Sequence, residues 1–302
     1  MTLAGITGGT GFVGQAVLAE MARRGQAGRA LARSDQAEQA GVRWIKGDLA
    51  DTAALARLCE GASAVIHIAG AVNLPTRTEF AVVNIAGTQA VVDAARAAGV
   101  RRFIHVSSLA AREPGLSDYG WSKRMAEEVV QVSGLDWTMV RPPAIYGPRD
   151  REILELFRAA RLRLVPMPPA GRASILHVDD LARLLLDLAD SAEASRRIFE
   201  PDDAQPGGWE HRDLAHAIGA AVGKRVWAPQ VPRVILSGAA QLDRLVRGKR
   251  AKLTPDRARY IAHPDWVSDP ARAVPRDLWQ PHIATPDGLR TTAQWYRAAG
   301  WL

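Results

Sequence analysis

A tyrosine and a lysine four residues apart, Tyr119 and Lys123, are the side chains of this 302-residue chain whose types and spacing best support chemistry. Residues four apart on a helix share a face, so the ammonium group would lie beside the phenol. A neighbouring cation lowers the pKa of a phenol from its usual value of about 10. We therefore expect a tyrosine that exchanges a proton with an alcohol or a forming alkoxide near neutral pH.

Two serines precede this pair in the chain. Ser107 and Ser108 end an apolar run that reads as a strand, which places them at the carboxyl edge of the expected sheet. Ligands of open α/β sheets bind at that edge, and a serine hydroxyl there can polarise a substrate carbonyl. Serine, tyrosine and lysine together indicate chemistry at a hydroxyl or carbonyl group.

A glycine-rich stretch, residues 7–14, lies between the first expected strand and the first expected helix. Early glycines allow a tight turn and a close approach of the backbone to a pyrophosphate, and Gly14 allows the helix to pack close to the sheet. The N-terminus of the helix then presents free N–H groups to the phosphates. We expect the turn to bind a dinucleotide through Gly8, Gly11, Phe12, Val13 and Gly14.

The end of the second strand bears on the choice of cofactor. An acidic side chain there bonds the ribose 2′-hydroxyl of NAD, whereas an arginine accommodates the 2′-phosphate of NADP. The strand is expected to end at Arg33, which favours NADP, and Asp35 leaves NAD as the alternative. Asp48 follows the third strand, where it would bond the adenine amino group or cap the next helix.

The elements that position these residues follow an alternating order. Short apolar runs alternate with helical patterns in the first half of the chain. This order predicts an α/β fold, a Rossmann-type doubly wound parallel sheet with helices on both faces. The expected strands span residues 3–7, 29–33, 42–45, 64–69, 102–107 and 137–141, and the expected helices span 15–24, 84–98 and 122–133.

The pattern becomes less regular after Pro142. Prolines at 142–143 and 166–169 interrupt any long element. We expect a dinucleotide-binding domain over residues 1–142 and a smaller, interleaved substrate-binding lobe over about 143–302. A helical pattern at 181–189 indicates that parts of about 176–200 return to the first domain.

Composition excludes several classes of protein. The chain has 39 basic and 32 acidic residues, a net charge of +7, but the acidic residues are interspersed throughout, which argues against a nucleic-acid partner. The single cysteine, Cys59, rules out an intrachain disulfide, argues against a metal site, and is typical of the reducing cytoplasm. We expect no signal peptide and no spanning helix, since no apolar run approaches about 20 residues.

One segment concentrates positive charge. An apolar stretch at 234–236 opens an expected amphipathic helix. Such a helix would lie on a membrane surface or pack over a substrate pocket, and the second interpretation is favoured. The basic run that follows consists of Arg244, Arg247, Lys249, Arg250 and Lys252.

The sequence resembles the extended, epimerase/dehydratase-like branch of the short-chain dehydrogenase/reductase superfamily over nearly its whole length. The matching motifs are residues 7–14, 47–49, 67–70, Asn84 with Gly87 and Thr88, 107–108, Tyr119 with Lys123, 141–148, 177–180, 295–296 and 300–302. The resemblance implies a catalytic triad of Ser108, Tyr119 and Lys123. Beyond the glycine turn, the implied cofactor-binding residues are Arg33, Asp48, Leu49, Ala69, Gly70, Lys123, which would hold the nicotinamide ribose, and Pro142.

Departures from the branch narrow the reaction. Leu109 and Ala110 stand where its dehydratases carry an Asp-Glu pair, and Ala173 stands where its 4-epimerases often carry an arginine. Cys59 lies far from any epimerase motif. These differences favour simple reduction of a carbonyl, or oxidation of an alcohol, on a small organic substrate. His67 is interpreted as a packed structural residue.

Three functions therefore follow. The leading one is an NAD(P)(H)-dependent oxidoreductase that interconverts a hydroxyl and a carbonyl by hydride transfer, with Tyr119 as acid/base. The alternatives are an NAD-dependent sugar-nucleotide epimerase and a non-catalytic NAD(P)-binding subunit of a larger complex. The intact Tyr119 and Lys123 argue against the last. By analogy with the family, the chain would form a homodimer.

Overall fold

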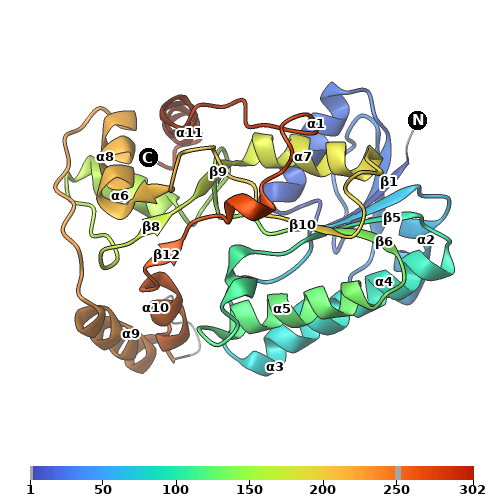
Figure 1. Cartoon of the computed structure of the whole chain (residues 1–302), viewed down its shortest axis with the longest axis horizontal. Coiled ribbons are helices and arrows are strands. Elements are labelled where there is room, and N and C mark those ends of the chain that lie inside the picture. Colours follow the sequence, from blue (N-terminus) through green and yellow to red (C-terminus); the bar gives the residue numbers. More distant parts are fainter. Residues whose placement is uncertain (1–2, 249–252) are drawn as a thin grey trace. The chain divides into compact units, whose positions relative to one another are not determined.

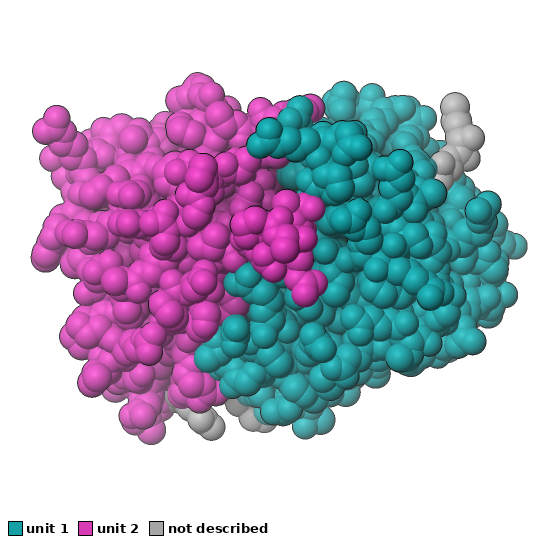
Figure 2. Space-filling view, viewed as in Figure 1, with its two compact units in different colours: residues 1–142, 181–200, 274–280 teal, residues 143–180, 201–273, 281–302 magenta. Residues whose placement is uncertain are grey.

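The computed structural model describes residues 3–248 and 253–302 (Figure 1). The chain forms two compact units, which Figure 2 colours separately. Unit 1 contains residues 1–142, 181–200 and 274–280, and unit 2 contains 143–180, 201–273 and 281–302. Each unit is therefore assembled from three separate stretches of chain.

Unit 1 is built on a seven-stranded sheet in the order β10-β6-β5-β4-β1-β2-β3. Every neighbouring pair is parallel, and the strand order reverses around β1, which pairs with both β2 and β4. This arrangement confirms the predicted Rossmann-type doubly wound sheet. The strands are β1 (Ala4–Thr7), β2 (Gly28–Ala32), β3 (Val42–Lys46), β4 (Ala64–His67), β5 (Arg102–Val106), β6 (Asp136–Val140) and β10 (Arg197–Phe199).

Helices cover both faces of this sheet. In Figure 1, α2, α4 and α5 lie on one face, and α1 and α7 lie on the other. With both faces covered, β4 and β5 are buried along their whole length, as parallel strands usually are. The helices are α1 (Phe12–Arg23), α2 (Thr52–Cys59), α3 (Arg77–Phe80), the π-helix η1 (Ala81–Ala86), α4 (Gly87–Ala97), the 3₁₀-helix η2 (Leu109–Arg112), α5 (Asp118–Gln131) and α7 (Val178–Asp190).

The main core of unit 1 lies between the sheet and two of these helices. Phe103 of β5 contributes a fully buried ring, and apolar side chains of α2 and α4 pack around it. Among them are Leu55, Leu58, Val91, Val92 and Ala95. This packing fixes the sheet edge from which the functional side chains extend.

The helix expected at 84–98 begins earlier than predicted. Thr76 caps α3 in a reciprocal capping box with Glu79, and the helix then runs through the π-helical segment before α4 begins at Gly87. Polar residues in 76–79 lack the apolar periodicity that marks a helix, so the expected start at Asn84 was wrong. π-helical turns are frequent at functional sites, and this one buries Asn84.

Other elements also differ from expectation. The helix expected at 122–133 begins at Asp118, because the Ser117 side chain accepts a hydrogen bond from Gly120 N and caps it there. Tyr119 therefore lies in the first turn of α5. The edge strand β10 was not predicted at all, because three residues are too few to show a pattern.

Unit 2 contains smaller sheets and five α-helices within its described residues. Its own core contains Tyr146, Phe157 and Tyr296, and the Tyr296 hydroxyl donates to the carbonyl oxygen of Asp150 at 2.9 Å. The strands are the pair β7 (Ala144–Tyr146) and β9 (Ile175–His177) and the trio β8 (Arg172–Ala173), β11 (Trp209–Glu210) and β12 (Asp265–Trp266). The helices are α6 (Leu154–Arg161), α8 (His211–Ala221), α9 (Arg233–Arg247), α10 (Pro255–Ile261) and α11 (Thr285–Ala298), with a 3₁₀ turn η4 (Pro270–Arg272).

No helix in residues 3–248 and 253–302 combines the length and the apolar content needed to span a bilayer. Part of the expected basic run, Lys249, Arg250 and Lys252, lies outside the described residues.

Candidate active site

The glycine turn follows β1 and leads into α1. Gly8 has a φ of +75°, and a Cβ there would lie 2.7 Å from Ala69 N. A Cβ on Gly14 would lie only 2.1 Å from the carbonyl oxygen of Gly8. Gly11 is the N-cap residue of α1 and makes no side-chain hydrogen bond to it. The first N–H groups of the helix, including those of Phe12 and Val13, are therefore not engaged in hydrogen bonds within the helix. This cradle fits the pyrophosphate of a dinucleotide.

We expect Gly14→Ala to weaken binding of NADPH and NADH at least about tenfold, since the new methyl group would displace the turn that approaches the phosphates. Fluorescence titration of the cofactor measures the effect. Gly115→Ala is the matched control, because its Cβ would meet no atom within 4 Å. Equal cofactor affinity in the two variants would contradict the assignment of the turn.

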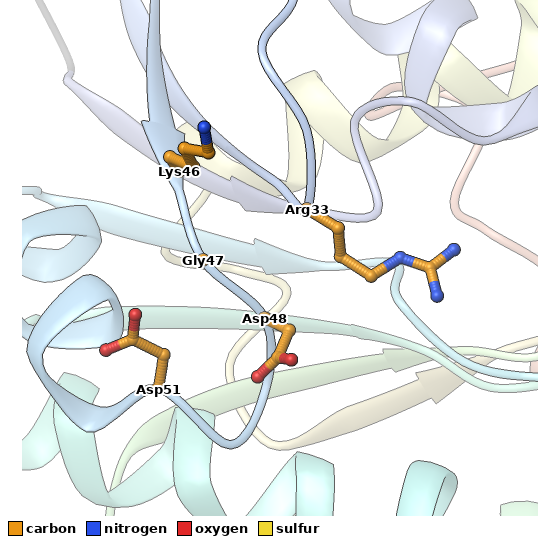
Figure 3. A pocket seen from close by; sticks show the side chains of 5 residues that line it. All are labelled: Arg33, Lys46, Gly47, Asp48 and Asp51. Carbon is orange, nitrogen blue, oxygen red and sulfur yellow. The ribbon is translucent and has the colours of Figure 1, made fainter.

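A surface hollow of about 240 Å³ lies beyond the ends of β2 and β3 (Figure 3). The guanidinium of Arg33 extends from the residue that follows β2, and the side chain of Lys46 points away from it (Figure 3). The Lys46 ammonium instead pairs with Asp35, with 3.0 Å between Nζ and Oδ2. The hollow is lined by Arg33, Lys46, Gly47, Asp48 and Asp51.

The segment after β3 corrects one interpretation of Asp48. Asp51, and not Asp48, caps α2, because its Oδ1 accepts from Ala54 N at 2.9 Å. Asp48 is exposed, and its carboxylate Oδ1 accepts from Ala50 N within its own loop at 2.8 Å. Its neighbour Leu49 packs against the main core of unit 1 and is partly buried.

The tyrosine and the serine meet at the carboxyl edge of β5. The side chains of Tyr119 and Ser108 are hydrogen-bonded to each other. Ser108 also caps the short helix η2, and its Oγ accepts from Ala110 N at 3.2 Å. On its other side the Tyr119 ring packs against the buried Phe80, with 6.2 Å between ring centroids. The phenol is therefore held between α3 and the end of β5.

Lys123 lies one turn further along α5 and is almost completely buried. Its Nζ donates to the carbonyl oxygen of Val106 at 2.7 Å. Burial lowers the pKa of Lys123 to about 8, and the carboxylate of Glu127 partly opposes this shift. The same ammonium lies 3.7 Å from the position that a Cβ on Gly70 would occupy.

The protonation of Tyr119 differs from the sequence expectation. Partial burial raises the pKa of the phenol, and the hydrogen bond with Ser108 opposes that rise. The expected lowering by Lys123 is wrong for this arrangement, because the loss of hydration dominates and the ammonium is bonded to the backbone of β5. The hydroxyl of Tyr119 is therefore neutral and keeps its proton at physiological pH.

Asn84 connects the elements around this edge. Its Oδ1 accepts from Ala71 N at 2.7 Å, and its Nδ2 donates to Ser122 Oγ at 2.9 Å. Ser122 in turn donates to the carbonyl oxygen of Tyr119 at 2.8 Å. The π-helical residue thus fixes the loop after β4 to the first turn of α5.

The remaining predicted residues lie along the same edge of unit 1. Ala69 N donates to Thr7 Oγ1 at 3.2 Å, which links the loop after β4 to the end of β1. The buried Pro142 accepts a hydrogen bond from Leu109 N at 3.1 Å, directly beside Ser108. The structure therefore brings Ser108, Tyr119, Lys123, Gly70 and Pro142 to one edge of the sheet.

His67 is structural, as the sequence indicates. Its ring nitrogens lie 2.7 Å from Thr7 Oγ1 and 3.0 Å from Thr88 Oγ1. Burial lowers the pKa of His67 to about 3, so the ring is neutral.

Sequence reasoning missed a buried ionic cluster behind the site. Glu127 accepts from Ser107 Oγ at 2.6 Å and from two guanidinium nitrogens of Arg141 at 2.7 and 2.8 Å. Arg141 also pairs with Glu200 at 3.3 Å, and Arg112 reaches the same carboxylate at 3.2 Å. The spacing of Glu127 four residues after Lys123 was an available signal, whereas nothing local marks Glu200.

Comparison with known proteins agrees with this geometry. A family model described as NAD(P)H-binding matches residues 8–192. A protein of Caulobacter vibrioides named ceramide reductase is 36% identical over 98% of this chain and 95% of its own length. The chain belongs to the extended short-chain dehydrogenase/reductase family. It is an NAD(P)-dependent oxidoreductase.

Other relatives fit the extended short-chain dehydrogenase/reductase assignment. The 2-alkyl-3-oxoalkanoate reductase of Stenotrophomonas maltophilia is 30% identical, covering 94% of this chain and 96% of its own length. A solved structure of UDP-glucuronic acid 4-epimerase from Bacillus cereus, in complex with UDP-glucuronic acid and NAD, shares the fold. Its TM-score is 0.74 at 15% identity, and the match covers 99% of this chain and 100% of the epimerase.

Proposed function

We propose that the chain uses NADPH to reduce a ketone on an aliphatic, lipid-like substrate. The observation that carries the proposal is the hydrogen bond between Tyr119 and Ser108, with the buried Lys123 ammonium one helical turn away. These groups have the chemistry that carbonyl reduction requires: a proton donor, a second hydroxyl for the carbonyl oxygen and a fixed positive charge.

Each residue then has one task. Ser108 donates a hydrogen bond to the substrate carbonyl and orients it towards Tyr119. Tyr119 gives its proton to the oxygen as negative charge develops there. Lys123 holds the nicotinamide ribose and favours the negative phenolate that remains. The bound nicotinamide supplies the hydride.

The substrate class follows from the names of the two similar reductases. Ceramide is a lipid, and a 2-alkyl-3-oxoalkanoate carries a ketone next to an alkyl branch. Leu109 and Ala110, which follow Ser108, are buried and apolar, so they supply no acid/base pair for dehydration. We assign cofactor binding to unit 1 and recognition of the aliphatic part to unit 2.

The test is a rate measurement with purified protein and NADPH. We expect 3-oxoacyl amides to be reduced, with kcat/KM at least about tenfold higher for long alkyl chains than for short ones. UDP-glucose serves as the substrate of the alternative, epimerisation, and we expect no UDP-galactose from it. Epimerisation of UDP-glucose without ketone reduction would reject the proposal.

Arg33 is the residue that we propose to select NADPH. We expect Arg33→Ala to raise KM for NADPH by about 10- to 100-fold and to leave KM for NADH nearly unchanged, since only NADPH carries the 2′-phosphate. Lys46→Ala is the control, because Lys46 lines the same hollow but pairs with Asp35. An equal effect of both substitutions would assign the preference to general positive charge instead.

The pH dependence follows from Lys123. Because the pKa of Lys123 is lowered to about 8, its ammonium loses the proton above that pH, while the pKa of Tyr119 is raised. We therefore expect kcat/KM for ketone reduction to be constant below pH 8 and to fall about tenfold per pH unit above it. The buried His67 and His105 do not titrate in this range, since burial holds the pKa of each well below 6.5. A profile that stays flat to pH 9.5 would contradict the role of Lys123.

A further inference from the structure

Helix α9 exposes apolar side chains along its length. Val234 and Leu245 are 82% and 83% exposed, and Ile235, Leu242 and Val246 are also mostly exposed. At 100° per residue these five positions fall within an arc of about 120°. The helix therefore presents one continuous apolar stripe to its surroundings.

The other face of α9 is the one that packs. Ala240 is completely buried and Leu236 is partly buried, and α10 is the helix against which α9 lies. Asp243 is on this side, where its Oδ2 accepts from Leu253 N at 2.9 Å. A helix normally buries its apolar stripe. Here a small and partly polar face is buried, and the larger apolar side chains remain outside. The expectation that this helix packs over a substrate pocket stays a prediction.

Positive charge accompanies the stripe. Residues 233–252 contain six basic side chains and one acidic side chain, a net charge of +5 of the chain's +7. The single acid, Asp243, is paired with Arg247, with 3.3 Å between Oδ1 and Nε. Arg233 and Arg247 lie on the opposite side of the helix, since at 100° per residue each is about 160° from the centre of the stripe.

We propose that α9 docks the protein on an anionic lipid bilayer, with the Val234–Val246 stripe inserted among the headgroups and the net positive charge of residues 233–252 attracting the protein to the lipid phosphates. An exposed apolar stripe on a helix in a segment of net positive charge is a pattern of helices that lie in the plane of a membrane surface. At 15 residues the helix spans about 22 Å, less than the roughly 30 Å hydrocarbon core, so it lies on the bilayer and does not cross it. This inference goes beyond the proposed reductase activity and does not depend on it.

Vesicle flotation tests the proposal without any turnover. We expect the full-length protein to float with vesicles of phosphatidylcholine containing phosphatidylglycerol, and to bind pure phosphatidylcholine more weakly. Leu245→Gln should lower partitioning to the anionic vesicles at least about tenfold. Leu162→Gln is the matched control, because Leu162 is 81% exposed and follows α6.

Three results would overturn the proposal. They are no flotation of the wild-type protein, equal flotation of the Leu245 and Leu162 variants, and equal binding to neutral and anionic lipid. Sedimentation velocity without lipid tests the remaining alternative, in which a second copy of the chain covers the stripe. If Leu245→Gln converts a dimer to a monomer, the stripe is a subunit interface and the membrane proposal is rejected.

Discussion

Replacing Tyr119 with phenylalanine is expected to lower kcat for ketone reduction by about 10²- to 10⁴-fold, the usual contribution of a positioned proton donor. The substitution removes only the hydroxyl that is hydrogen-bonded with Ser108 and keeps the ring that packs against Phe80. The Kd for NADPH should therefore change little. Steady-state rates and cofactor titration on the same preparation separate the two effects.

Tyr260→Phe is the control for this substitution. Tyr260 lies in α10 of unit 2, where its ring packs against Trp266 and is not among the proposed catalytic groups. It should keep wild-type kcat. Unchanged turnover in Tyr119→Phe would contradict the role of the phenol as proton donor. If the wild-type protein turned over no ketone at all, the alternative of a non-catalytic nucleotide-binding subunit would be favoured.

Replacing Arg141 with methionine is expected to lower the free energy of unfolding by about 3–5 kcal/mol, the range for breaking a buried ion pair by removal of one partner. The guanidinium bridges two completely buried carboxylates, Glu127 and Glu200, and neither can reach water when it is lost. Urea denaturation monitored by tryptophan fluorescence gives the difference directly.

Arg290→Met is the comparison for stability. Arg290 pairs with Asp287 at the same 2.7 Å distance, but both side chains are more than half exposed. Exposed pairs of this kind contribute about 0–1 kcal/mol. Similar losses in the two variants would mean that the cluster around Arg141 is reached by solvent, contrary to its burial in the structure.

The sequence predicted the parts of the fold whose signals are local. Buried parallel strands are continuous apolar runs, so β1, β4 and β5 could be located within one or two residues. The glycine turn could also be located, because the close contact of Gly14 with the backbone of Gly8 excludes any larger residue. The spacing of four placed Tyr119 and Lys123 on one helix, although the helix pattern at 122–133 did not extend back to Tyr119 and the cap at Ser117 was missed.

Features that depend on distant partners could not be predicted in this way. Glu200 meets Arg141 only because β10 pairs with β6, a contact between segments that are far apart in the chain. The pKa of Tyr119 depends on how much water remains around its hydroxyl, which spacing on a helix does not specify. The orientation of the α9 stripe likewise follows from which face α10 occupies.

The pairing of strand β10 with β6 determines where the chain can be truncated. A fragment that ends at Pro142 would contain the glycine turn, Ser108, Tyr119 and Lys123, and therefore all the residues proposed for catalysis. It would, however, leave the outer backbone groups of β6 without their partner strand and Arg141 without Glu200. An unpaired edge strand can form hydrogen bonds with strands of other molecules. We therefore expect the truncated protein to aggregate under conditions in which the full-length protein stays in solution.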